Sequence, residues 1–401
     1  MKKKKLMLLG GLRYLLPVIE AAHKEGYHVI TCDYLPDNIA HKYSDEYVNL
    51  SIIDKEAVLE KARELEIDGI MSFAVDPGVV SAAYVAEKMG LPFAGSYESV
   101  KILQNKDLFR QFLTDNGFNV PVSGGYSGYQ DAMDDIGKFT FPVIVKPTDS
   151  AGSKGVTRVD KMDELENAFQ HAFDNSIAGK VIIEEFIEKE GCSSDTDSFS
   201  LDGDLRVVTY SAQRFDSNAP NPYTPSAYSW PSTFTEEEEK YLTSELQRLI
   251  NLLGLKTSIY NIETRIGKNG KPYIMEVSPR GGGNRLAEMV RYGTGVDMIS
   301  AYVRSAVGDP IGQLPPAVFD GYWAEVVLHA IKPGIFERIE ISREYKRYVI
   351  EEDLWVQEGN KINEFNGAND AIGTLVLRFS DAASLEKAIS SVDEWCKIIV
   401  K

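Results

Sequence analysis

Glu263 and Glu276 flank a turn signal, and their spacing predicts a pair of carboxylates able to bind a divalent cation. Between them, Asn269-Gly270 is a dipeptide typical of a two-residue β-hairpin turn. That turn places Glu263 directly opposite Glu276, with Cβ atoms about 5 Å apart. Their repulsion near a protein surface is on the order of 4 kcal/mol, and a bound cation with oxygen ligands removes it. The alternative is that both side chains splay into solvent on an exposed hairpin and bind nothing.

The same register gives the predicted hairpin one apolar face and one polar face. It pairs Thr264 with Met275 on the apolar face and Arg265 with Ile274 on the polar face. Because side chains alternate along a strand, a buried face of this kind fixes the register.

Several segments upstream have features suited to a nucleotide. Residues 148–155 are rich in small side chains, which let backbone N–H groups surround an anion, although the spacing is not that of a Walker A loop. Lys146 ends an apolar strand and is expected to have an anionic partner. The strand at residues 181–183 runs into Glu184-Glu185-Phe186-Ile187, which can offer backbone groups to a flat ring. A mobile surface loop and a structural ion pair remain the alternative interpretations of the first two features.

These segments lie on a chain whose patterning predicts three modules. Short apolar runs alternate with helical patterns over residues 1–95, which predicts a parallel sheet covered by helices. A second module is expected over residues 96–312, with a lid lobe at about 120–182. A linker near residues 310–316 leads to a small α+β domain at 320–401. The predicted fold class is therefore a multidomain combination of α/β and α+β architecture.

Composition limits the partners and the compartment. The chain has 401 residues and a formal net charge of −17, which argues against nucleic acid and anionic membranes as partners. The apolar run after the lysine-rich start is too short for a secretory signal or a membrane span. Cys32, Cys192 and Cys396 form no CxxC motif, and an odd number of cysteines fits a reducing compartment. We expect a cytoplasmic protein.

The order of these elements resembles the ATP-grasp superfamily, in the branch of biotin carboxylase, carbamoyl-phosphate synthase, the purine-pathway ligases and the L-amino acid ligases. The resemblance covers residues 96–306 and rests on Lys106, Lys146, the loop at 150–155, Val-Ile-Ile-Glu-Glu-Phe-Ile and Glu276-Val-Ser-Pro-Arg280. It implies an N-terminal Rossmann-like sheet, a two-lobed ATP-grasp domain, and ATP with Mg²⁺ as cofactors, Mn²⁺ being an alternative. It also implies a reaction that converts a small-molecule carboxylate to an acyl phosphate, which an amine attacks with release of ADP and phosphate.

The resemblance further implies roles for individual residues. Glu263 and Glu276 would bind the metal, with Ser278 standing where the family usually has an Asn. The expected ATP-binding residues are Lys106, Lys146, Gly152, Ser153, Gly155, Glu184, Glu185, Phe186 and Ile187. Glu190, Asp195 or Asp197 would substitute for a missing ribose-binding Glu. Arg280 would stabilise the transferred phosphoryl group, and Lys154 and Arg265 are further candidate catalytic residues.

The acceptor site is less defined by the sequence. Asp76 is expected to cap a helix and Trp230 to be a core aromatic residue, rather than to contact substrate. The remaining acceptor-site candidates are Arg214, Arg265, Arg280, Asn284 and Arg285.

Other functions stay open at this level. A purine-pathway enzyme such as phosphoribosylamine–glycine ligase and a non-catalytic ATP-binding protein both share the fold. A nicotinamide-dependent oxidoreductase is suggested by Gly10-Gly11 after the first strand and Asp33 at the end of the second, but the full GxGxxG motif is missing. A homodimer is an assembly that the resemblance allows.

Overall fold

A four-stranded parallel sheet forms the N-terminal part of the molecule, as the alternating pattern predicts. The computed structural model describes residues 2–150 and 154–401. Strand order is β3-β2-β1-β4, all parallel. The strands are β1 (Lys5–Leu9), β2 (His28–Asp33), β3 (Glu46–Asn49) and β4 (Gly69–Ser72), and the covering helices are α1 (Leu16–Lys24), α2 (Lys55–Glu64) and α3 (Asp76–Met89).

Local signals explain where these helices begin and end. The Asp54 carboxylate accepts a hydrogen bond from the Ala57 N–H and caps α2. Helix α3 ends at Gly90, whose φ of +68° is readily adopted only by glycine.

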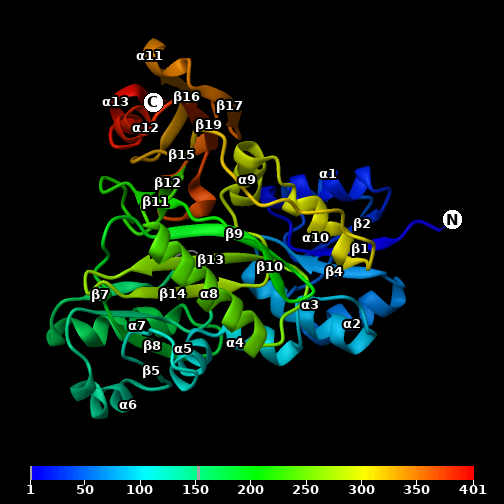
Figure 1. Ribbon diagram of the computed structural model, residues 1–401, viewed down its shortest axis with the longest axis horizontal. Helices are drawn as coiled ribbons and strands as arrows, with labels where there is room; N and C mark the ends of the chain where they lie inside the picture. The colour runs from blue at the N-terminus through cyan, green and yellow to red at the C-terminus, as the bar shows by residue number, and fades with distance from the viewer. Residues whose placement is uncertain (1, 151–153) are drawn as a thin grey trace.

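The antiparallel lid sheet, in the order β5-β8-β6-β7, lies at the opposite end of the molecule (Figure 1). It follows helices α4 (Tyr97–Gln104) and α5 (Lys106–Asp115), which are capped by Ser96 and Asn105. Its elements are β5 (Ser123–Tyr126), α6 (Tyr129–Asp134), β6 (Val143–Pro147), β7 (Thr157–Val159), α7 (Leu165–Asp174) and β8 (Val181–Glu185).

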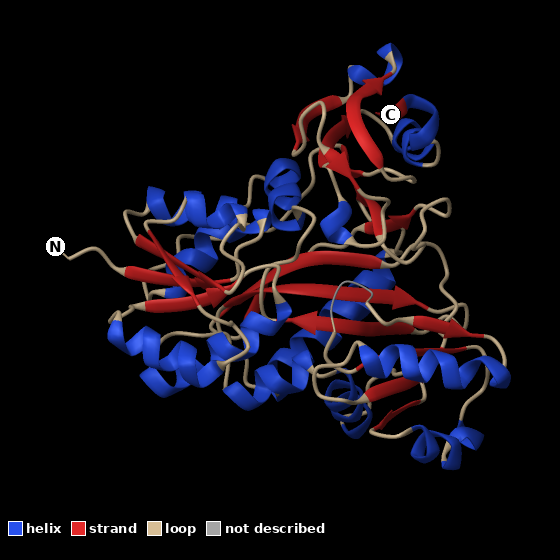
Figure 2. Cartoon of the chain, turned by 180° about the vertical axis from the view of Figure 1, so that it is seen from behind, coloured by secondary structure: helices blue, strands red, loops and turns tan. Residues whose placement is uncertain are grey.

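The central sheet has the order β10-β9-β13-β14, and its neighbouring strands are antiparallel. Figure 2 shows its long strands running through the middle of the molecule, with the C-terminal strands above them. A capping box between Thr235 and Glu238 begins α8. The elements are β9 (Ser194–Leu201), β10 (Asp204–Val207), α8 (Glu236–Leu252), β13 (Ser258–Ile266) and β14 (Pro272–Ser278).

Helices α9 (Leu286–Thr294) and α10 (Met298–Ala306) return the chain to the N-terminal sheet. Leu6 and Leu8 of β1 share one buried core with Met298 and Val303 of α10. Gly69 is needed at this contact because a Cβ there would come within 2.2 Å of the Ala306 carbonyl oxygen. The first module is therefore packed firmly against the second.

The C-terminal sheet includes strands from the middle of the chain. In the order β11-β12-β15-β19-β17, it joins β11 (Ala212–Phe215) and β12 (Pro225–Trp230) to strands beyond residue 320. It thus crosses the predicted limit of the C-terminal module. The later elements are β15 (Tyr322–Leu328), β16 (Gly334–Ile341), α11 (Arg343–Lys346), β17 (Val349–Leu354), β18 (Lys361–Ile362), β19 (Gly373–Phe379), α12 (Ala382–Ile389), α13 (Val392–Trp395) and β20 (Cys396–Val400). In the described part of the chain, no helix combines the length and apolar character that a membrane crossing requires.

Candidate active site

Glu263 and Glu276 face each other across β13 and β14, as predicted. Their side chains are about one-third exposed, at 33% and 36%. This is enough exposure for a ligand to reach both carboxylates while the strands hold them in place. The interpretation that the pair lies on a free, solvent-exposed hairpin is wrong, because the hairpin forms half of the central sheet.

The pairing is correct, but the turn that produces it is not the predicted one. The Gly267 N–H bonds to the Lys271 carbonyl, which leaves a three-residue loop that ends at Gly270 with φ of +72°. This loop shifts the register by one residue, so Thr264 pairs with Ile274 and Arg265 with Tyr273. A β-bulge at Met275 then offsets the shift and returns Glu276 to its place opposite Glu263.

Positive charges flank the glutamate pair on both sides. The Lys106 Nζ atom, in the first turn of α5, lies 3.9 Å from Glu276 Oε2 and donates a hydrogen bond to the Ser150 carbonyl at 2.9 Å. On the other side, Arg265 Nη2 lies 3.5 Å from Glu263 Oε1. The Arg265 guanidinium also contacts Ser193 and the Ile187 carbonyl. Lys106 and Arg265 are thus brought to the predicted site.

The chemistry of this donor set suits Mg²⁺, which prefers carboxylate oxygens and usually keeps ligands from water and nucleotide phosphates. Within residues 2–150 and 154–401, no three His, Cys, Asp or Glu side chains form a complete metal cage. Two carboxylates with open positions are what a metal shared with a nucleotide requires. Glu263 and Glu276 therefore fit the implied metal.

Arg280 is held by a residue from the N-terminal sheet. Asp76 Oδ1 accepts hydrogen bonds from Arg280 Nε at 2.9 Å and Nη2 at 2.5 Å, and Arg280 Nη1 reaches Asn261 Oδ1 at 3.2 Å. Burial alone would raise the pKa of Asp76. The positive charge of the Arg280 guanidinium has the larger effect, so the pKa of Asp76 lies below its ordinary value. Helix α3 is capped at Val75, so the expected capping role of Asp76 is wrong.

Ser278 belongs to the same cluster. Its hydroxyl donates to Asp76 Oδ1 at 2.9 Å and accepts from Gln104 Nε2 at 2.7 Å. One lone pair remains on this oxygen. The contacts tie Ser278 to the support of Arg280, and its role as a metal ligand stays a prediction.

Two aspartates, Asp195 half-buried and Asp197 fully buried, lie beside the glutamate pair. The sequence suggested them only as substitutes for the ribose-binding Glu. Asp195 lies opposite Glu263, and Asp197 lies opposite Asn261, both on β9. Burial, followed by the charge of Glu263, raises the pKa of Asp195 to about 7. Burial also raises the pKa of Asp197 to about 7, although its carboxylate accepts the Gly282 N–H at 2.9 Å. Their position beside the glutamate pair was not predicted, because it depends on the pairing of β9 with β13.

Lys146 and Glu184 form a buried ion pair that Arg110 completes. Lys146 Nζ bonds to Glu184 Oε1, and Arg110 Nε bonds to Glu184 Oε2 at 3.0 Å. Burial would raise the pKa of Glu184, but Arg110 and Lys146 lower it to about 2. Arg110 also donates to the Met275 carbonyl at the bulge, at 2.8 Å. The predicted anionic partner of Lys146 is therefore Glu184, and Arg110 is a further residue that sequence reasoning missed.

The segment after β8 is extended, but several of its backbone groups are engaged. The Phe186 N–H bonds to the Pro142 carbonyl, and the Ile187 carbonyl accepts from Arg265 at 3.1 Å. Glu185 Oε1 accepts the Thr140 N–H. Glu190 is exposed, and its N–H bonds to the Ile266 carbonyl. The adenine and ribose roles of these four residues remain predictions.

Only part of the predicted phosphate loop, residues 148–155, lies within the described residues. Gly152 and Ser153 lie outside the described residues. Lys154 is exposed, and Gly155 is buried with φ of +72°. A Cβ at Gly155 would lie 2.8 Å from the Asn175 Cβ and 2.9 Å from Pro147 Cγ, so only glycine fits this end of the loop.

The acceptor-site candidates separate into two groups. Trp230 is fully buried and stacks with Phe319, which confirms its role in the core. Arg214 pairs with Glu386 on α12. Asn284 and Arg285, in contrast, lie at the start of α9 and both have left-handed φ angles, 49° and 55°. Such strain in residues other than glycine is concentrated at functional sites.

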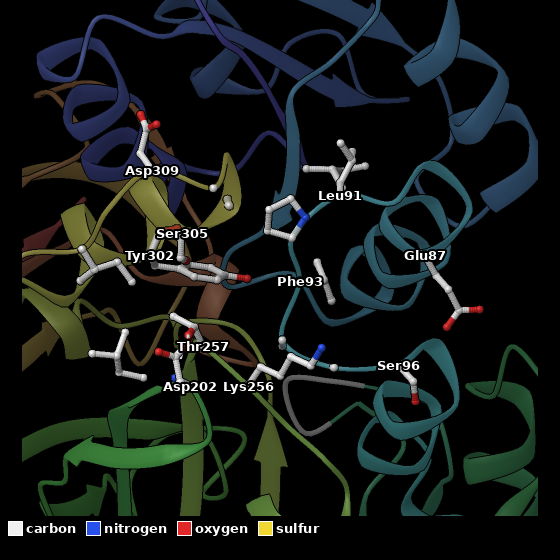
Figure 3. Close-up of a pocket in the computed structure, with 18 of the residues that line it drawn as sticks. Glu87, Leu91, Phe93, Ser96, Asp202, Lys256, Thr257, Tyr302, Ser305 and Asp309 are labelled. Atoms are coloured by element: carbon white, nitrogen blue, oxygen red, sulfur yellow. Dashed lines mark hydrogen bonds between the residues drawn. The ribbon is translucent and has the colours of Figure 1, made fainter.

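A separate cavity of about 900 Å³ lies where the N-terminal sheet meets the central sheet, around Phe93, Lys256 and Tyr302 (Figure 3). None of the residues predicted to bind nucleotide or metal lines it. It is therefore distinct from the glutamate site.

The order and geometry of these groups match a known family of domains. Residues 139–288 match the family model described as "ATP-grasp domain". This part of the chain is an ATP-grasp domain. The ATP-grasp match begins before β6 and ends in α9, so it includes Lys146, Glu184, the glutamate pair and Arg280.

Curated relatives of this chain have different names, and the chain covers different shares of their lengths. The carbamoyl phosphate synthase large chain of Thermoanaerobacter sp. (strain X514) is 24% identical over 64% of this chain, but over only 23% of its own length. D-alanine–D-alanine ligase A of Bacillus cereus is 26% identical over 60% of this chain and 79% of that protein. The chain thus spans about a quarter of the carbamoyl phosphate synthase large chain that it matches.

A solved structure is similar over the whole chain. The L-amino acid ligase from Bacillus licheniformis is 22% identical, covers 100% of both chains and has a TM-score of 0.81. At this identity the likeness shows that the arrangement of the modules is shared. The predicted fold class is therefore confirmed.

Proposed function

We propose that this chain is a Mg²⁺- and ATP-dependent ligase that joins a small carboxylic acid to an amine and forms ADP and phosphate. The observation that carries the proposal is the direct opposition of Glu263 and Glu276 beside Lys106. Opposed carboxylates are unfavourable without a cation, and a nearby ammonium group suits the phosphates that accompany one.

The relatives support the class of reaction. D-alanine–D-alanine ligase and L-amino acid ligase are named for joining amino acids, and both are similar to this chain over more than half its length.

The chemistry divides into two steps. An oxygen of the substrate carboxylate attacks the γ-phosphorus of ATP; a P–O bond forms, the bond to the β-phosphate oxygen breaks, and ADP leaves. The amine nitrogen then attacks the acyl carbon, a C–N bond forms, and phosphate leaves as the nitrogen loses a proton. Bound Mg²⁺ would supply charge neutralisation on the phosphates.

The residues of this chain orient and neutralise the reacting groups. Glu263 and Glu276 would hold the metal, and Lys106 would contact a phosphate oxygen in place of its present contact with Glu276. Arg280 is fixed by Asp76 and Asn261, so its guanidinium needs little reorganisation to meet developing negative charge. Lys146 is largely buried beside Glu184 and would contribute positive charge to the nucleotide site.

The test is a screen for ADP and phosphate release over carboxylic acids, each with and without amines, followed by mass spectrometry of the product. The wild-type protein is expected to form an amide with at least one pair of substrates. Glu276→Gln is expected to reduce ADP release by about 100-fold or more, because it removes half of the metal site.

Glu188→Gln is the matched control. Glu188 is an exposed carboxylate that pairs with Lys268 in the loop of the same hairpin, away from Glu276. Its substitution is expected to leave ADP release unchanged. Full activity of Glu276→Gln would refute the metal assignment, and a lack of ADP release by wild type with every pair would refute the ligase function.

A further inference from the structure

The cavity between the N-terminal sheet and the central sheet is large enough for a small molecule, at about 900 Å³. Its wall comes from three parts of the chain: residues 91–96 after α3, Asp202 with residues 253–257 of the central module, and residues 302–311 from α10 onward. Ligand sites form preferentially where modules meet in this way. The proposed reaction uses none of the residues that line this cavity.

Tyr302 on α10 brings a hydroxyl group without a partner to the cavity. The residue is only 4% exposed, and among the described residues its Oη atom has no hydrogen-bond partner. The neighbouring Ser258 hydroxyl donates to the Ile259 carbonyl, at 2.9 Å. Figure 3 shows the Tyr302 hydroxyl at the tip of the ring, pointing into the cavity. Because buried polar groups nearly always have a partner, a molecule bound in the cavity is expected to supply one.

Lys256 brings a second unpaired donor to the same cavity. Its backbone is fixed, because its N–H donates to the Ala94 carbonyl at 2.7 Å and its carbonyl accepts from the Gly203 N–H at 3.2 Å. Its side chain, in contrast, has neither an ion pair nor a hydrogen bond among the described residues. A rigid backbone thus presents a free ammonium group at the cavity that Tyr302 enters (Figure 3).

The other polar side chains of the cavity wall already have partners. These are Tyr97 for Glu87, Ser99 for Ser96, Thr257 for Asp202, the Tyr302 carbonyl for Ser305, and Lys4 with Tyr27 for Asp309. The Glu87 carboxylate is also turned away from Tyr302 in Figure 3. The groups left to bind a ligand are therefore a hydroxyl and an ammonium, which suit an acceptor with a single negative charge.

Much of the remaining wall is apolar. It includes Leu91, Pro92, Phe93, Leu253 and Ile311. Such side chains bind a hydrocarbon body, and the few polar groups among them fix its orientation. A molecule that suits both parts of the wall has one carboxylate and an aliphatic or aromatic body.

We propose that this cavity is a second ligand site, which binds a small organic acid through Tyr302 and Lys256. Tyr302 Oη and Lys256 Nζ donate to the carboxylate oxygens, and the body of the acid packs against Phe93 and the other apolar side chains. The bound acid contacts the N-terminal and central modules together, so it stabilises their packing. The site lies apart from the glutamate pair, and the proposal does not depend on the proposed function.

The test is isothermal titration calorimetry of the full chain, without nucleotide or metal, with a panel of straight-chain and aromatic monocarboxylates. Each acid is paired with its uncharged primary amide, such as hexanamide for hexanoate. Tyr302→Phe removes one oxygen atom from the cavity, and Lys256→Gln removes the positive charge. Tyr241→Phe and Lys240→Gln are the matched controls, because both residues are exposed on α8 and neither lines the cavity.

At least one acid is expected to bind wild type and both controls, whereas its amide does not bind. The Kd of that acid is expected to rise at least tenfold in Tyr302→Phe and in Lys256→Gln. Without ligand, Tyr302→Phe should have a Tm equal to that of wild type or higher, because the lost hydroxyl has no partner in the fold. If no acid binds, or if the two variants bind as wild type does, water alone fills the cavity and the proposal is wrong.

A second titration separates this site from the candidate active site. The Kd of the acid is expected to be unchanged in Glu276→Gln, and in wild type saturated with Mg²⁺ and a non-hydrolysable ATP analogue. An acid whose binding requires Glu276 but not Tyr302 would occupy the ligase site, which would refute the second site and support the proposed function. Binding that requires Tyr302 in a protein that never releases ADP would have the opposite meaning.

Discussion

The Asp76 carboxylate receives two hydrogen bonds from the Arg280 guanidinium, at 2.9 and 2.5 Å. Asp76 begins α3 beside the N-terminal sheet, whereas Arg280 follows the last strand of the central sheet. A residue of one module thus sets the orientation of the arginine in the other. Bonds that fix a side chain in this way contribute to catalysis by reducing its reorganisation during the reaction.

Asp76→Asn is expected to lower kcat for ADP release by 10- to 100-fold while KM for ATP changes little. The variant keeps the shape of the side chain but removes the charge that holds Arg280. Asp309→Asn is the control, since Asp309 pairs with Lys4 and Tyr27 far from the hairpin. Equal kcat values for the two variants would show that Arg280 does not need its partner.

Mg²⁺ is expected to raise the Tm of the wild-type protein, and Glu263→Gln is expected to abolish that increase. Without metal, the variant should be as stable as wild type or more so, because it removes the repulsion between two opposed carboxylates. Differential scanning calorimetry with Mg²⁺ and with a chelator measures both effects. A Tm increase of the same size in Glu263→Gln would place the cation elsewhere.

Neighbouring glycines in the loop before α9 should respond differently to alanine. A Cβ at Gly282 would lie 2.7 Å from Asn261 Nδ2 and 2.9 Å from Asp197 Oδ1, whereas at Gly283 the nearest atom is a Tyr14 ring carbon at 3.6 Å. Gly282→Ala is therefore expected to destabilise the fold by about 1–3 kcal/mol and to impair activity. Gly283→Ala should be nearly neutral in urea denaturation, and similar losses in both would contradict the described packing.

The buried Glu184 should make stability depend on pH in the acid range. Arg110 and Lys146 lower the pKa of Glu184 from 4.5 to about 2. The contribution of the charged Glu184 side chain to the free energy of unfolding is therefore present above pH 4.5 and is lost as the pH falls toward 2. That contribution is on the order of 3 kcal/mol. Urea denaturation of wild type and Glu184→Gln should show a stability gap that narrows between pH 5 and pH 3. A gap of constant size over this range would indicate that Glu184 is not selectively stabilised in its charged form.

Sequence patterns predicted those features of the structure that are determined by residues close together in the chain. The capping box at Thr235, the buried run of β1 and the opposed glutamates were all recoverable from neighbouring residues. The hairpin also shows the limit of such patterns. Asn269-Gly270 indicated a two-residue turn, but the bulge at Met275 depends on Arg110, which lies 165 positions away and binds the Met275 carbonyl.

The missed residues owe their importance to distant partners. Arg110 and the buried Glu325 of β15 each lie in segments with no distinctive motif. Each becomes significant only where strands from different parts of the chain meet, as β13 meets β9 and β12 meets β15. Burial of a polar side chain by a remote segment leaves no periodic signal in the sequence around it, so these residues could not be identified before the fold was known.

The pairing of β12 with β15 has a consequence for dissecting the molecule. A fragment that stops at residue 312 retains the entire matched region, 139–288, yet it loses the strand beside β12. Tyr228 and Trp230 would then border an open strand edge, with unpaired backbone groups next to two large aromatic rings. Such a fragment is a poor choice for isolating the nucleotide-binding region, because the unpaired edge of β12 favours aggregation over correct folding.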